Sequence, residues 1–414
     1  MPSPAPVSRR SMVKSVFAAG GLAALADRSF AAQPTIANPP ISPKDGLKVT
    51  RLETFLIKPR WLFLKIHTDE GLVGLGEPIT EGRALTCAQA VAELEPYLIG
   101  QDPTRVVHHW QAMYRHAFYR GGPVLTSALS GVEQALWDLT GKSLGVPVYK
   151  LFGGPTRDRI RMYKHAGSDP AAMKALVAQG WNAFKTGVNG GRPARIIETQ
   201  GFVERAAANF AALREAAGPE VDIAVDFHGA IQPQTAKLLI KALEPYQPMF
   251  IEEPVQCQNV DIMADIARGT HLPIATGERI FTKWGFREIL EKHAASILQP
   301  DLCHAGGIHE VHLIAGMAEA YYAAVAPHNP LGPISLAACL QLDATIPNFI
   351  AQEHVSLGEG YLKNPFVVKD GFIDLPTGPG LGIELDEEAM ADKLGHDWTN
   401  PMSYHPDDHS VVDW

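Results

Sequence analysis

The sequence predicts an α/β fold in which a (β/α) barrel follows a smaller α+β capping domain. Beyond about residue 155, short apolar segments alternate with helical patterns, and six consecutive segments each end in a polar residue. These residues recur at intervals of 23 to 27 positions, close to the roughly 30 residues that one βα unit of a barrel occupies. They are Asp226, Glu252, Glu278, Asp301, His328 and Glu353.

The capping domain is predicted between residues 47 and 155. Its first part alternates apolar and polar residues, which is typical of antiparallel strands, and its second part has helical periodicity. The predicted strands are Lys48–Ile57, Trp61–Thr68 and Leu72–Gly76, and the predicted helices are Ala84–Leu98, Val106–Tyr119 and Val124–Leu144.

The barrel is predicted between residues 156 and 355, and residues 356–414 are expected to pack with the barrel and the capping domain. Two earlier apolar strands, Ile160–Lys164 and Ala183–Thr186, bring the strand count to eight. Continuous apolar runs are expected where parallel strands are covered on both faces. All strand ends of a barrel open onto one face, so the six polar residues should converge. A lone acid after a strand can be a helix cap, but capping would accept Ser, Thr or Asn equally.

Composition limits the classes of function. The chain has 414 residues, of which 46% are hydrophobic and 20% charged, as in a globular enzyme of more than one domain. A net charge of -9 without a Lys/Arg block argues against nucleic acid or an anionic membrane surface as a partner. A small anionic substrate is still allowed, because a metal can reverse the local charge. The four scattered cysteines are expected to be buried free thiols.

Residues 1–32 have the pattern of an export signal. A basic stretch is followed by an apolar run from Val16 to Ala26, which is too short to span a bilayer. Residues 8–14 (SRRSMVK) resemble the twin-arginine signal. We therefore expect cleavage after Ala31, a linker over residues 33–46 and a periplasmic mature protein without a membrane segment. The alternatives are a cytoplasmic protein with a disordered tail, or a short anchor.

Three acidic residues predict a metal site. Asp226, Glu252 and Glu278 end three adjacent strands, so their carboxylates can meet at one point. Without a cation they would repel one another and take up protons, whereas oxygen ligands of this kind suit Mg²⁺. Mn²⁺ is expected to substitute. Glu253 follows Glu252 along a strand and should face the opposite way.

A metal of this kind can hold a substrate carboxylate and stabilise the enediolate that forms when the adjacent carbon loses a proton. The candidate base is His328, with Asp301 on the intervening strand to orient its ring and raise its basicity. His228, two residues beyond Asp226, lies at the other flank and is the candidate acid. The alternative for His228 is a structural histidine.

The motifs around these residues resemble those of the mandelate racemase branch of the enolase superfamily, and within it they are most similar to those of the galactonate dehydratases. The resemblance runs from about Leu47 to the C-terminus. The motifs are VDFHG at 225–229, FIEEP at 250–254, GER at 277–279, QPDLCHAGG at 299–307 and APH at 326–328, with Arg60-Trp61 and FYRGGP at 118–123 in the capping domain.

The resemblance implies an enolase-like, modified TIM barrel with one Mg²⁺ per subunit, a homo-oligomer, and a sugar-acid hydro-lyase reaction. His328 with Asp301 would remove the C2 proton, and His228 would protonate the departing C3 hydroxyl. Glu353 would hydrogen-bond the enediolate as a protonated or shared-proton carboxyl, and the enol would become a 2-keto-3-deoxy acid. The implied substrate-binding residues are Lys185, Arg60, Tyr119 and Arg120.

Some positions depart from the family pattern. The family has Lys-x-Asn at the second strand, where this chain has Lys185-Thr186-Gly187, and Cys303 and Asn329 also differ. A dehydratase for another aldonic or aldaric acid is therefore an alternative. A racemase or epimerase is a second alternative, but it would want a second lysine on that strand. An exported binding protein without turnover is the third.

Overall fold

The computed structural model describes residues 46–188, 198 and 200–413. The predicted export signal and all but the last residue of the predicted linker lie outside the described residues. The chain from Gly46 onward forms one compact unit. Among the described residues, none of the helices combines the length and apolar character needed to cross a membrane.

The capping part begins with an antiparallel sheet in the order β1-β2-β3 and continues as helices, as the sequence predicts. Helix α3 is buried along most of its length and packs between β3 and the barrel helix α10. Gly74 and Gly76 permit this close approach, because a Cβ on either would overlap the carbonyl oxygens of Ala135 and Gly131. The elements are β1 (Val49–Ile57), β2 (Trp61–Thr68), β3 (Val73–Gly76), α1 (Ala84–Leu98), α2 (Val106–His116), α3 (Pro123–Leu144) and the short α4 (Val148–Leu151).

Helix α2 is shorter than predicted. It ends at His116 rather than at Tyr119, because Ala117 turns to an extended backbone conformation. Gly121 and Gly122 then adopt positive φ angles of 78° and 80°, which favour glycine. Residues 117–122 therefore form a loop between α2 and α3.

Eight parallel strands form the barrel sheet, in the order β10-β9-β8-β7-β6-β5-β4-β11. Val325 of β10 forms a parallel bridge with Phe349, which lies just before β11 in the chain. The sheet therefore closes on itself, and the predicted barrel is confirmed. The strands are β4 (Arg159–His165), β5 (Ala183–Gly187), β6 (Asp222–Asp226), β7 (Ile251–Glu252), β8 (Ile274–Thr276), β9 (Ile297–Leu298), β10 (Ala324–Val325) and β11 (Gln352–His354).

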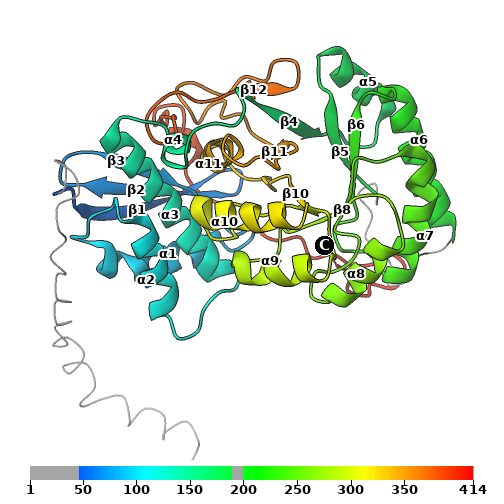
Figure 1. Cartoon of the computed structure of the whole chain (residues 1–414), viewed down its shortest axis with the longest axis horizontal. Coiled ribbons are helices and arrows are strands. Elements are labelled where there is room, and N and C mark those ends of the chain that lie inside the picture. The colour runs from blue at the N-terminus through cyan, green and yellow to red at the C-terminus, as the bar shows by residue number, and fades with distance from the viewer. Residues whose placement is uncertain (1–45, 189–197, 199, 414) are drawn as a thin grey trace, which may run out of the picture. The chain divides into compact units, whose positions relative to one another are not determined.

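Helices between the strands cover the outside of the sheet (Figure 1). Their apolar faces and the outward side chains of the strands make the main hydrophobic core. A second, smaller core fills the inside, where Tyr163 and Phe250 pack among alanines of the neighbouring strands. The helices are α5 (Pro170–Ala178), α6 (Gln200–Ala217), α7 (Pro233–Leu243), α8 (Val260–Arg268), α9 (Thr282–Glu291), α10 (Gly307–Ala320) and α11 (Pro333–Asp343), with single turns η1 (Glu244–Tyr246) and η2 (Ala391–Lys393).

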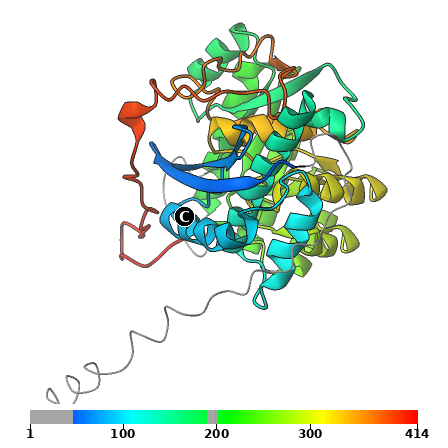
Figure 2. The same ribbon diagram turned by 90° about the vertical axis from the view of Figure 1, so that its left-hand side faces the viewer.

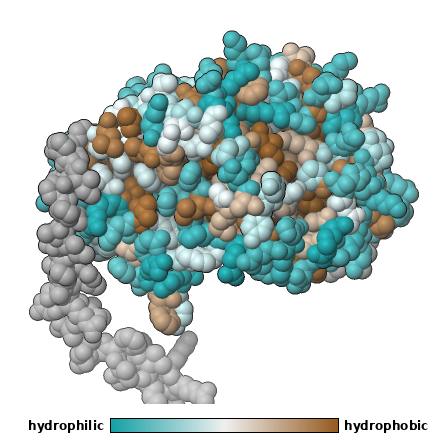
Figure 3. Space-filling model, viewed as in Figure 1, coloured by the Kyte–Doolittle hydropathy of each residue, from teal (hydrophilic) through white to brown (hydrophobic). Residues whose placement is uncertain are grey.

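The C-terminal segment contacts both parts of the fold. Strand β12 (Phe372–Asp374) pairs antiparallel with β4, and Gly395 N donates to Leu56 O of β1. In Figure 2 this segment, orange to red, runs beside the blue capping sheet. On the face shown in Figure 3, hydrophobic residues are interspersed among hydrophilic ones.

Candidate active site at the carboxyl ends of the barrel strands

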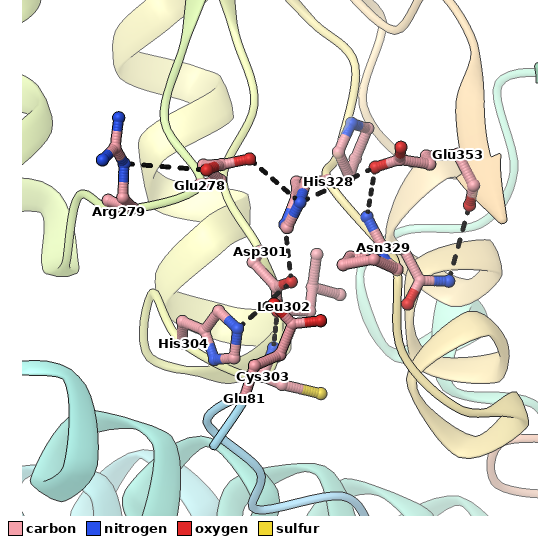
Figure 4. A network of polar contacts seen from close by, with 12 residues as sticks. Glu81, Glu278, Arg279, Asp301, Leu302, Cys303, His304, His328, Asn329 and Glu353 are labelled. Atoms are coloured by element: carbon pink, nitrogen blue, oxygen red, sulfur yellow. Dashed lines mark hydrogen bonds and ion pairs between the residues drawn. The ribbon is translucent and has the colours of Figure 1, made fainter. Parts of the chain in front are cut away.

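The predicted histidine–aspartate pair is present at the ends of β9 and β10. His328 Nδ1 lies 2.9 Å from Asp301 Oδ2 (Figure 4). Burial alone would lower the pKa of His328, but the facing carboxylates of Glu278 and Asp301 raise it well above its usual value. The two carboxylates therefore favour the protonated ring in this structure, with Nδ1 toward Asp301 and Nε2 toward Glu278.

Two further carboxylates face Nε2 of His328. Glu278 Oε2 lies 3.1 Å away and Glu353 Oε2 lies 3.9 Å away. Burial by itself would raise the pKa of Glu278, but the opposing charges of His328 and then His228 hold it well below its usual range. His328 thus contacts Asp301 through Nδ1 and the predicted metal ligand Glu278 through Nε2.

Asp301 is completely buried and is held on both oxygens. Its Oδ1 accepts a hydrogen bond from Cys303 N at 2.7 Å, and its Oδ2 faces His304 Nε2 at 3.5 Å as well as His328. His304 Nδ1 in turn lies 3.0 Å from Ser127 Oγ of α3. The sequence prediction missed His304, although it lies three residues beyond Asp301, inside the quoted motif.

Lys185 of β5 is surrounded by carboxylates. Its Nζ lies 2.7 Å from Glu353, 3.0 Å from Glu252 and 3.5 Å from Asp226. Burial opposes the charged form, but these three acids raise the pKa of Lys185 well above its usual value. The ammonium group, predicted to contact the substrate carboxylate, here neutralises acids of the site instead. The neighbouring Thr186 lies between Lys185 and Gly187, the position where the family has Asn, and its Oγ1 donates to Gly167 O at 2.7 Å.

The predicted metal ligands border the same buried region. Asp226 and Glu252 share Lys185 Nζ, whereas Glu278 contacts His328. In the described part of the chain, no three acidic, His or Cys side chains already gather their donor atoms as a metal ion requires. Burial and then the charge of Asp226 raise the pKa of Glu252 to about 8. Glu252 Oε2 is buried without a hydrogen-bond partner, so this donor set fits a hard divalent cation.

Glu253 faces away from this region, as predicted. Its carboxylate forms an ion pair with Arg279 and accepts a hydrogen bond from Thr276 Oγ1 at 2.5 Å. His228 has a positive φ of 55°, and its backbone N–H donates to Asp226 Oδ1 at 2.7 Å. The His228 charge is one of the causes that lower the pKa of Glu278.

Glu353 lies between Lys185 and the loop that carries His328. Its Oε2 accepts a hydrogen bond from Asn329 N at 2.9 Å. Burial would raise its pKa, but Lys185 and then His328 lower it below the usual value. These neighbours favour the ionised form of Glu353 in this structure, and its role toward an enediolate stays a prediction.

The capping-domain residues predicted to bind substrate separate into two groups. Arg60 contacts the loop that carries His328, because its Nη2 donates to Pro330 O at 3.1 Å. The same nitrogen lies 2.6 Å from Glu81 Oε1. Tyr119 is 84% exposed, and Arg120 donates to the carbonyls of Ala117 and Arg115. The structure brings Arg60 toward the site but leaves Tyr119 and Arg120 on the exposed α2–α3 loop.

Comparisons with known proteins agree with this geometry. Residues 50–153 match the mandelate racemase / muconate lactonizing enzyme N-terminal domain, and residues 169–389 match the enolase C-terminal domain-like family. The chain is 50% identical over 385 residues to a D-galactonate dehydratase of Ralstonia pickettii (strain 12J), covering 89% of this chain and 100% of the relative. A D-galactonate dehydratase of Pectobacterium atrosepticum is 47% identical with the same coverage.

Solved structures have the same fold. An enolase from Agrobacterium radiobacter, bound to Na and L-malate, superposes with a TM-score of 0.82 at 33% identity, covering 88% of this chain and 99% of that one. A mandelate racemase/muconate lactonizing enzyme from Jannaschia sp. CCS1 superposes with a TM-score of 0.81 at 31% identity, covering 85% and 98%.

Proposed function

The chain belongs to the mandelate racemase / muconate lactonizing enzyme family of the enolase superfamily, and from this premise we propose that it dehydrates D-galactonate to 2-dehydro-3-deoxy-D-galactonate. The reaction is a β-elimination of water across C2 and C3, which makes the protein a hydro-lyase. One observation carries the proposal: a buried His328–Asp301 pair faces a ring of carboxylates in a chain about half identical to D-galactonate dehydratases over their whole length.

The proposal includes one Mg²⁺ held by Asp226, Glu252 and Glu278. These residues supply hard oxygen donors, and the buried Oε2 of Glu252 has no other partner. When bound, the ion would supply positive charge that favours the anionic form of the substrate. Because Lys185 Nζ contacts both Asp226 and Glu252, ligation by these two acids would require Lys185 to release at least part of that contact.

His328 is proposed to remove the C2 proton. Its Nε2 faces Glu278 in this structure. If Glu278 binds the metal ion instead, the hydrogen bond from Nδ1 to Asp301 would fix the tautomer that leaves Nε2 able to accept a proton. As the ring becomes an imidazolium, the Asp301 charge 2.9 Å away stabilises it. Asp301 is therefore expected to act mainly in the removal of the C2 proton.

His228 is proposed to protonate the leaving C3 hydroxyl. Its charge acts on Glu278, and Glu278 Oε2 lies 3.1 Å from Nε2 of His328, the proposed base. Two imidazoles on different flanks of one substrate can carry out proton removal and proton donation separately. Lys185 is engaged with three acids and no second lysine follows it on β5, which disfavours a racemase.

The test is a product screen. The purified protein with Mg²⁺ is offered a panel of aldonic and aldaric acids, and 2-keto-3-deoxy acid is measured for each. D-galactonate should be the best substrate by kcat/KM. A panel in which another sugar acid is preferred would change the assigned substrate, and a panel without keto product would reject the hydro-lyase activity.

We further propose that residues 1–32 direct twin-arginine export to the periplasm and that the mature chain forms a homo-oligomer. Support for export comes from the Arg9-Arg10 pair and the apolar run after it. Replacing both arginines by lysine should leave the protein in the cytoplasm, and recovery of uncleaved protein only from the cytoplasm of unmodified cells would contradict export. Light scattering of the purified protein would measure the assembly.

A further inference from the structure

The loop that carries His328 is held by side chains from other parts of the chain. Residues 327–331 form no backbone–backbone hydrogen bond with one another in the structure. Instead, side chains of other elements bind the loop's backbone, so the place of His328 depends on them. The partners are Gln352 Nε2 to Pro327 O at 3.1 Å, Glu353 Oε2 to Asn329 N at 2.9 Å, Arg60 Nη2 to Pro330 O at 3.1 Å and Glu77 Oε1 to Gly332 N at 2.7 Å.

Glu77 ends this loop by capping the next helix. It follows β3 of the capping domain and is completely buried. Its two oxygens accept hydrogen bonds from Gly332 N at 2.7 Å and Ser335 N at 2.9 Å. The first N–H groups of a helix need a partner, and Gly332, the N-cap of α11, has no side chain to provide one. A carboxylate from the capping domain therefore replaces the missing cap.

Several features of the chain fit this contact. A Cβ on Gly332 would lie 2.6 Å from Glu77 Oε1, so a small residue at that position makes room for the carboxylate. Glu77 is itself fixed, because its backbone N–H donates to Gln134 Oε1 of α3 at 3.0 Å. No part of the proposed reaction uses this buried acid.

We infer that Glu77 is a positioning residue: by capping α11 from the capping domain, it fixes the loop that presents His328 to the substrate. The inference rests on the proposed function for the role of His328 as the base. It gives the capping domain a part in proton removal beyond covering the barrel.

Glu133 offers a matched control. It is also a completely buried carboxylate of the capping domain, and it caps α10 by accepting from Ile308 N at 2.7 Å and His309 N at 2.8 Å. The turn at Asp301, however, closes on itself, because His304 N and Ala305 N donate to Asp301 O. Asp301 therefore does not need the Glu133 cap to hold its place.

The experiment compares Glu77→Gln with Glu133→Gln in the full chain with Mg²⁺ and D-galactonate. An amide can accept only one of the two N–H groups, so α11 should shift. Glu77→Gln should lower kcat by about 10- to 100-fold, as expected for a displaced catalytic group, with KM changed by less than about twofold. Glu133→Gln should keep kcat near that of the unmodified protein. An equal fall in both variants would make Glu77 merely structural and overturn the inference.

A second readout does not need turnover. In protein labelled with [15N]histidine, the Nδ1–H of His328 gives a resonance that His328→Asn identifies by its loss. This resonance should shift or disappear in Glu77→Gln and persist in Glu133→Gln. An unchanged resonance and unchanged kcat in folded Glu77→Gln would refute the inference. If the unmodified protein makes no keto acid, the proposed function fails, while the resonance still decides the role of Glu77.

Should Glu77→Gln not fold, Gly332→Ala provides the same displacement from the other side. Its Cβ would push against Glu77 Oε1 and Oε2, while the backbone at Gly332, with φ of -81°, accepts alanine. The expected result is the same loss of kcat and shift of the His328 resonance. Unchanged values in this folded variant would equally overturn the inference.

Discussion

Replacing Asp301 by asparagine should disable the base while the fold persists. Asp301 is completely buried, and its Oδ2 faces His328 Nδ1 at 2.9 Å. Asparagine has nearly the same shape but no charge to stabilise the imidazolium that forms when His328 takes up the C2 proton. If its oxygen stays toward Cys303 N, its NH₂ group faces Nδ1 and forces the tautomer that cannot accept a proton at Nε2.

The size of the effect follows from the charge that is removed. Two unit charges about 4 Å apart attract by about 4 kcal/mol at an effective dielectric constant of about 20, which suits sites in proteins. Some of that attraction already exists before proton transfer, so about 3 to 4 kcal/mol is available to the transition state. Since each 1.36 kcal/mol is a factor of about ten in rate, proton removal should slow by about 10²- to 10³-fold.

The assay follows exchange of the C2 proton with D₂O by NMR, using 3-deoxy-D-galactonate, which has no C3 hydroxyl to lose. Keto-acid formation from D-galactonate is measured in parallel. Asp343→Asn is the matched control, because Asp343 is also completely buried and neither side-chain oxygen has a hydrogen-bond partner. Burial raises its pKa well above the usual value, so an amide resembles its neutral form and activity should persist. Exchange at the normal rate in folded Asp301→Asn would refute the role of the pair.

Four further outcomes are expected. His228→Asn should keep C2 exchange and lose dehydration by about 100-fold or more; normal dehydration would reject its acid role. Chelation should abolish activity, Mg²⁺ or Mn²⁺ should restore it, and Mg²⁺ should raise Tm; no change in Tm would count against the metal site. Gly76→Ala, whose Cβ overlaps Gly131 O, should cost about 2 kcal/mol or more, whereas Gly46→Ala, with open space around it, should leave Tm unchanged. Burial raises the pKa of Glu133 from 4.5 to about 8, so between these pH values the folded state keeps a proton that the unfolded state loses, and the free energy of unfolding falls as pH rises. In urea titrations across this pH range, the free energy of unfolding should fall less with pH in Glu133→Gln than in the unmodified protein. An equal fall in both proteins would contradict the raised pKa.

The order of the fold could be predicted because barrel strands obey a repeating physical rule. Each strand is a short apolar run buried on both faces, and its polar end lies on the common face of the barrel. This placed Asp301 beside His328 from spacing alone. The predicted end of α2 was wrong because helical periodicity continues through Phe118 and Tyr119, whereas the backbone already turns to an extended conformation at Ala117.

The contacts of Lys185 could not be predicted from its position on β5. A strand position determines the face to which a side chain points, but not which of several acids a four-carbon chain reaches. Three carboxylates within 3.5 Å of Nζ hold the ammonium inside the ring. The same limit applies to Glu353, whose charge state depends on Lys185 and on His328 rather than on its own sequence neighbours.

The contacts between the capping domain and the barrel can be traced to polar residues in a helix whose periodicity alone predicts only a buried position. Helix α3 is apolar on most sides, yet polar residues recur along it at Ser127, Ser130, Gln134 and Asp138, and all four are buried. A buried polar stripe must find hydrogen-bond partners, and this one finds loop backbones and a loop side chain: Ser130 Oγ accepts from Gly306 N, Gln134 donates to Leu302 O, Asp138 accepts from Leu381 N, and Ser127 meets His304. Because Leu302, His304 and Gly306 lie shortly after Asp301 in the chain, the helix that looks like core also holds the loop that follows Asp301.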